Sequence, residues 1–223
     1  MGNLSEFLME ELNVATAFTI PIFGGIEVAE STVISWVIMA IIVILTLVLT
    51  RNMRVEKPGK LQVGVEYTVT ALQNLVRGII GHEGERYVPY LSTVLVFLGI
   101  SNIFAIFGMK PPTMDLNVTA ALALMSIILV QAASIRQNKV GGWLKGFTKP
   151  SKVITPLNVM ELAIRPLSLC MRLFGNVMGA FVVMKLLEHL VPVILPAVFS
   201  LYFDFFDGLL QAYVFVFLTG LYI

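Results

Sequence analysis

STVISWVIMAIIVILTLVLT, residues 31–50, is a run of twenty residues without one charged side chain. A helix of about 20 apolar residues is long enough to cross the hydrocarbon core of a bilayer. The stretches 88–108 and 117–135 are uncharged as well, whereas the longer apolar stretches 153–187 and 191–223 contain charges within them. The sequence therefore predicts an all-α integral membrane protein with about five membrane-embedded helices.

The composition of residues 1–223 supports a single membrane domain. Hydrophobic residues make up 57% of the chain and charged residues only 13%, whereas roughly a quarter of the residues in a soluble domain are charged. The net charge of +1 gives no bulk basic character, so we expect no nucleic-acid partner. The one cysteine, Cys170, excludes an internal disulfide and gives no metal-ligand pattern, so we expect neither a metal nor a cofactor.

Charged residues are distributed unequally between the segments that flank the apolar stretches. Residues 1–30 contain acidic residues and no basic one, and they lack the basic start of a cleaved signal peptide. The segments 51–87 and 136–152 carry most of the Lys and Arg residues. The positive-inside rule places both basic segments in the cytoplasm, the amino terminus outside and the carboxyl terminus inside.

The first basic segment also contains apolar side chains at helical spacing, namely Leu61, Val65, Val69, Leu72, Val76 and Ile79. This pattern predicts an amphipathic helix that lies at the cytoplasmic membrane surface. A helix that packs against other protein would show the same pattern and is about as well supported.

The last two apolar stretches differ from the others in length and in polarity. At 1.5 Å per residue, residues 153–187 would extend about 52 Å, against about 30 Å of hydrocarbon. We therefore expect a long, strongly tilted helix that forms a hairpin with residues 191–223, with the turn around residues 188–196. Stepping 100° per residue places one set of polar groups and glycines on a single face: Glu161, Arg165, Ser168, Arg172, Gly175, Asn176 and Gly179. The second helix carries Asp204, Gly208, Gln211 and Phe215 on one stripe, with Asp207 at its edge.

Two facing polar stripes predict a hydrated path through the membrane. An arginine at the membrane centre costs several kcal/mol on insertion scales, so Arg172 should face protein or water. Other interpretations exist for each residue taken alone. Arg172 can be a packing charge paired with a carboxylate, Asn176 and Gln211 can be interhelical hydrogen-bonding groups, and Glu188 can be an ordinary solvated charge at a helix end.

Three motifs make the polar stripes recognisable. Residues 161–176, ELAIRPLSLCMRLFGN, closely resemble the signature of subunit a of F-type ATP synthases. Residues 210–215, LQAYVF, and residues 112–119, PTMDLNVT, resemble two further elements of that family. The resemblance covers most of the chain from about residue 31 onward.

The resemblance implies roles for the residues on the stripes. Arg172 corresponds to the family's essential arginine, which faces a rotating ring of small subunits, and Asn176 and Gln211 match the polar positions beside it. Phe181 stands where many members have a carboxylate, and Asp204 stands where some have histidine. We therefore expect the ion path to use Asp204 first, then Asp207 and Glu188, together with Ser168 and Glu161. Gly175 and Gly179 would let the ring approach closely.

The resemblance also implies an assembly and a location. The chain would be the stator subunit that provides two ion half-channels for H⁺ or Na⁺, with ATP chemistry on partner subunits and no catalytic residue of its own. Its partners would be the c-ring, subunit b of the peripheral stalk and the lipid of a bacterial cell membrane. Two alternatives are a secondary transporter, which would usually show internal repeats, and a structural membrane subunit with a buried packing arginine.

Overall fold

The computed structural model describes residues 16–20, 26–51, 53–54, 59–81, 84–107, 110–147, 155–190 and 199–223. Within them lie the helices α2 (Glu30–Thr50), α3 (Lys60–Ile80), α4 (Val88–Ile103), α5 (Leu116–Phe147), α6 (Thr155–Leu190) and α8 (Gly208–Tyr222). A π-helical segment, Leu201–Asp207, leads into α8, and three short 3-10 helices are Glu85–Tyr87, Phe104–Phe107 and Pro112–Met114. The predicted all-α membrane class is confirmed.

Four helical segments in the described part of the chain are long and apolar enough to cross a membrane: Glu30–Thr50, Leu116–Trp143, Thr155–Glu188 and Leu201–Tyr222. The stretch predicted over residues 88–108 is divided, because α4 ends at Ile103 and a 3-10 helix continues to Phe107. One feature was not predicted from the sequence. Strands β1 (Thr16–Ile20) and β2 (Ile26–Ala29) pair antiparallel within the predicted outer segment.

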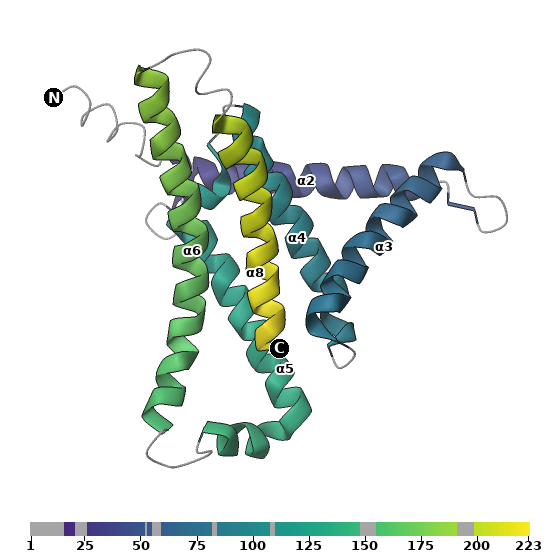
Figure 1. The fold of residues 1–223 in the computed structure, drawn as a ribbon, viewed down its shortest axis with the longest axis vertical. Coiled ribbons are helices and arrows are strands. Elements are labelled where there is room, and N and C mark those ends of the chain that lie inside the picture. Colours follow the sequence, from purple (N-terminus) through teal and green to yellow (C-terminus); the bar gives the residue numbers. More distant parts are fainter. Residues whose placement is uncertain are drawn as a thin grey trace, which may run out of the picture.

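Helices α6 and α8 lie side by side along the long axis of the molecule, while α2 lies across that axis (Figure 1). The 36 residues of α6 extend about 54 Å, nearly twice the hydrocarbon thickness of about 30 Å. The direction of α6 and α8 thus differs strongly from that of α2, and their tilt within a bilayer stays a prediction. Large apolar side chains of α2, such as Val43, Leu47 and Val48, are exposed, as expected for a surface that meets lipid.

The buried core is formed by α3, α4, α5, α6 and α8, and α8 contacts each of the other four helices. It includes Leu91 and Leu98 of α4, Leu173 of α6 and Phe215 of α8, all of them at most 1% exposed. The motif at residues 112–119 contributes its aspartate to this framework. Asp115 accepts hydrogen bonds from the hydroxyl of Ser31 in α2 and from the backbone N–H of Asn117, at 2.8 Å, in the first turn of α5. One buried carboxyl group thus ties α2 to the start of α5.

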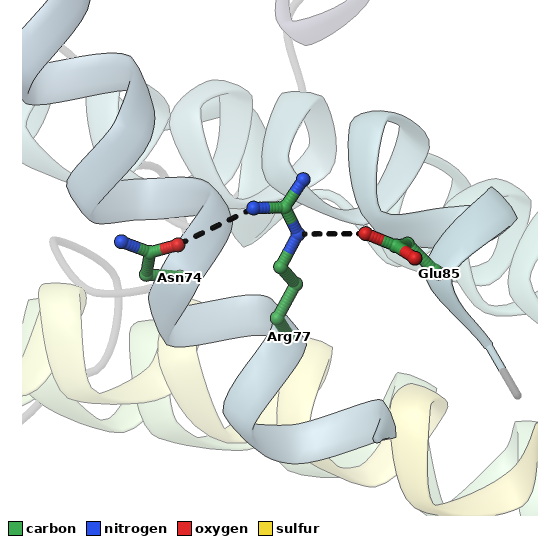
Figure 2. Close-up of polar contacts among 3 residues, drawn as sticks. All are labelled: Asn74, Arg77 and Glu85. Carbon is green, nitrogen blue, oxygen red and sulfur yellow. Dashed lines mark hydrogen bonds and ion pairs between the residues drawn. The ribbon is translucent and has the colours of Figure 1, made fainter. Parts of the chain in front are cut away.

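Helix α3 packs within its own chain over its second half. Val76 is fully buried, and the methyl carbon Cγ2 of Ile79 lies so close to Gly220 of α8 that an added Cβ would meet it at 2.9 Å. The first half is exposed, with Leu61 80% accessible. At the end of α3, Arg77 binds Glu85 at 3.3 Å and Asn74 at 3.4 Å (Figure 2). The end of α3 is therefore fixed to the chain that enters α4.

Helix α5 continues beyond the predicted boundary at residue 135. It bends at Lys139, whose φ of 57° is uncommon for a residue other than glycine. After the bend, the indole N–H of Trp143 donates a hydrogen bond to Gln131 at 2.9 Å. The first part of the predicted basic loop is therefore helical and folds back onto α5.

Candidate functional site

The polar stripe of α6 lies on the outer surface of the chain. Glu161, Ser168, Arg172, Gly175, Asn176 and Gly179 are exposed, and Arg165 is half-buried. Leu169, Cys170 and Leu173, on the opposite face, are buried against the bundle. The helical period therefore turns Leu169, Cys170 and Leu173 toward the bundle and leaves most of the polar stripe exposed in the described part of the chain.

The two arginines on this stripe have different surroundings. Arg165 binds Glu161 at 2.9 Å, one turn earlier in the helix, and its guanidinium lies 4.9 Å from the centre of the Tyr222 ring. Among the described residues, no carboxylate lies within ion-pair distance of Arg172. The packing-charge interpretation of Arg172 required such a partner, and the described residues supply none.

The glycines beside Arg172 leave its surroundings open. A Cβ built on Gly175 or on Gly179 meets no atom within 4 Å. Gly208 of α8 is different, since a Cβ on it would lie 2.9 Å from the Cβ of Asn102. The missing side chains at 175 and 179 are thus not needed for packing inside this chain. Gly175 and Gly179 therefore form a flat strip of exposed backbone, to which a partner protein could pack closely.

One hydrogen bond joins the two polar stripes. The side-chain amide of Asn176 donates to the carbonyl oxygen of Gln211 at 2.7 Å, linking α6 to α8. Gln211 is only 5% exposed, whereas Asn176 lies on the open face. The bond therefore connects the exposed surface around Arg172 with the interior between the helices.

Behind this bond lies a cavity of about 150 Å³, walled by α6, α8 and the end of α4. Its polar lining includes Gln211, Asp207, Glu188, Lys185, Asn102 and Ser200. This volume is enough for several water molecules. Glu188 is exposed at the far end and bound to Lys185 at 3.2 Å, so the cavity runs from a charged rim to the buried amide of Gln211.

The predicted acidic residues are placed differently from one another. Asp207, Glu188 and also Phe181 line the cavity. The backbone of Asp204 belongs to the π-helical segment, but its side chain lies outside the described residues. Glu161 is engaged by Arg165, and Ser168 is exposed on the stripe one turn before Arg172. Asp207 is thus the described carboxylate that lies near Gln211.

The sequence reasoning missed Asn102. Its amide donates to the backbone carbonyl of Gly208 at 2.8 Å, and its carbonyl oxygen accepts from the hydroxyl of Thr113 at 2.8 Å. It is 3% exposed and lines the cavity. The bond to Gly208 fixes the junction between the π-helical segment and α8, and so sets where Asp207 and Gln211 face. The only available signal was an asparagine inside an uncharged stretch.

Comparison with known proteins gives one consistent result. A family model described as ATP synthase A chain matches residues 32–223. The chain is 38% identical over 201 residues to ATP synthase subunit a of Moorella thermoacetica, covering 90% of this chain and 91% of that protein. It is 31% identical over 215 residues to the sodium-ion-specific ATP synthase subunit a of Propionigenium modestum, covering 89% of this chain and 74% of that protein.

Proposed function

Since this chain belongs to the family of ATP synthase subunit a, the ion-translocating membrane subunit of that complex, we propose that the exposed stripe of α6 is the surface past which ring carboxylates travel. Membership makes the chain a stator subunit in ion transport, with the ATP chemistry on partner subunits. The roles of individual residues are our proposal. The observation that carries it is an exposed Arg172 with no carboxylate partner in the described chain, beside two glycines with open space.

The chemistry of a guanidinium suits a fixed charge. Arginine keeps its proton at any working pH, so Arg172 cannot relay one. An opposite charge nearby favours the ionised form of a carboxyl group. A ring carboxyl that has released its ion can therefore pass Arg172 as a carboxylate, while the fixed cation opposes direct flow of ions between the two half-channels.

The cavity between α6 and α8 supplies one half-channel in this proposal. Ions enter at the rim near Glu188, pass Asp207 and reach the ring at the bond between Asn176 and Gln211. The charge distribution of the sequence supports an outer position for this rim. Asp204 lies three residues before Asp207 and remains assigned to the same path. Ser168 and Glu161 lie on the opposite side of Arg172 and would border the cytoplasmic half-channel.

We also propose the immediate partners and the location. A ring of small c subunits would cover the stripe of α6, where Gly175 and Gly179 permit close helix packing. Subunit b of the peripheral stalk would bind elsewhere on the chain, and the membrane would be a bacterial cell membrane with both basic loops in the cytoplasm. The coupling ion is H⁺ or Na⁺, and one relative is sodium-ion-specific by name.

A transport measurement separates this proposal from a secondary transporter, which would act unaided. Vesicles that contain the assembled complex should take up ions when ATP is added, and vesicles that contain the purified chain alone should not exchange ions. Repeating the uptake with and without Na⁺ identifies the coupling ion. Gradient-driven exchange by the chain alone would contradict the proposed dependence on the ring.

A further inference from the structure

A second polar cavity lies at the opposite end of the bundle from the Glu188 rim. It has a volume of about 280 Å³ and lies between the turn that enters α4 and the far end of the apolar part of α5. Arg86 and Tyr87 line it from the turn before α4, and Arg136 and Gln137 line it from α5. Ile80 and Ala133 form part of its apolar wall. The proposed ion path uses none of these residues.

The two arginines of this cavity have no acidic partner in the described chain. Both are exposed, and no described carboxylate lies within ion-pair distance of either. The acidic neighbour of Arg86 in the sequence, Glu85, is bound by Arg77 (Figure 2). Two guanidinium groups therefore border one cavity without an ion pair to a described carboxylate, although like charges that share a site repel each other; Ile223 also lines the cavity.

The position of the cavity across the membrane follows from the apolar stretches next to Arg86 and Arg136. Arg86 precedes Val88, the first residue of α4, by two positions, and Arg136 follows directly after the uncharged stretch 117–135. With those stretches in the hydrocarbon, both arginines lie at the level of the lipid headgroups. The positive-inside rule assigns this level to the cytoplasmic leaflet.

We propose that this cavity binds the phosphate group of an anionic phospholipid from the cytoplasmic leaflet. Guanidinium groups bind phosphate oxygens through paired N–H donors, and Tyr87 and Gln137 line the same cavity. Basic pockets between membrane helices on the cytoplasmic side are suited to anionic headgroups. The apolar wall of Ile80 and Ala133 accommodates the start of an acyl chain. Bound there, the lipid would join the ends of α3, α4 and α5.

The test uses the assembled complex in phosphatidylcholine vesicles that contain phosphatidylglycerol with a photoreactive headgroup. Cross-links should map to residues 80–87 and 133–137. The double variant R86Q/R136Q should bind the probe about 30-fold more weakly, since each basic residue adds about a factor of five to anionic-lipid binding. R86K/R136K, which keeps both charges, should retain most of the cross-linking.

Three controls test whether the cross-links come from a phospholipid bound at this cavity. R51Q/K60Q removes two exposed charges from the same basic loop away from the cavity and should leave these cross-links unchanged. R172A should also leave them unchanged, which separates this site from the ion path. Competition by inorganic phosphate would assign the same phosphate chemistry to a free anion, and insensitivity to it would assign the site to the lipid. Equal cross-linking in R86Q/R136Q and the wild-type complex, or an equal loss in R51Q/K60Q, would overturn the proposal.

Discussion

Replacing Gly179 by leucine tests whether the stripe of α6 is a surface for a partner. Nothing lies within 4 Å of a Cβ at this position, so leucine is accommodated by the chain itself. Glycine is about 1 kcal/mol less favourable than a good helix former inside a helix. Gly179→Leu should therefore keep or increase the stability of the subunit. If a ring packs against this strip, however, the added side chain must abolish or strongly slow ATP-driven ion pumping.

The matched control is Gly208→Ala, where the obstruction is internal. An added Cβ would lie 2.9 Å from the Cβ of Asn102, and overpacking of this kind costs typically 1–3 kcal/mol. Thermal unfolding of the detergent-solubilised subunit should thus show a loss at position 208 and none at 179. The pumping assay, run on the assembled complex in vesicles, should show a severe defect at 179. Wild-type pumping by Gly179→Leu would refute the reasoning about the open strip.

Three further predictions concern the cavity, its support and the topology. Asp207→Asn and Asp204→Asn should each slow ATP-driven pumping while the complex stays assembled, and wild-type rates in both variants would remove these carboxylates from the path. Asn102→Ala leaves the buried hydroxyl of Thr113 without its acceptor, so the unfolding free energy should fall by about 1–3 kcal/mol in denaturant titrations; an unchanged value would show that the junction at Gly208 is held by other contacts. A cysteine placed at Lys145 should react with an impermeant reagent in inverted vesicles only, and labelling from outside intact cells would reverse the topology.

The sequence predicted those features that depend on periodicity and hydropathy. The phase of the polar stripe on α6 follows from 3.6 residues per turn, and the structure leaves Arg172 and Gly179 exposed on one face. The end of α4 was harder to predict from the sequence, because the apolar residues 104–107 suit an α-helix and a 3-10 helix equally well. The amphipathic pattern of α3 left two interpretations open, and contacts such as that of Ile79 with Gly220 resolve its second half in favour of packing within the chain.

The cavity was not predictable in the same way. Its shape depends on which side chains of α6 and α8 fail to meet, and such a gap leaves no periodic signal in the sequence. Asn102 illustrates the difficulty, because its two partners lie 11 and 106 residues away along the chain. The prediction that Asp204 comes before Asp207 in the ion path was based on position along a helix. The structure describes Asp207 at the cavity and does not describe the side chain of Asp204.

The most direct test of the central claim is ATP synthesis by an assembled complex that carries Arg172→Ala. Removing an intramembrane charge relieves a cost, so assembly should survive the substitution. The fixed cation between the half-channels would be lost, and we predict that synthesis and ATP-driven pumping are both abolished. Arg172→Lys should restore little, because an ammonium group can lose its proton when desolvated and lacks the planar fork of guanidinium. Normal ATP synthesis by assembled Arg172→Ala complexes would contradict the account and leave Arg172 as a packing charge only.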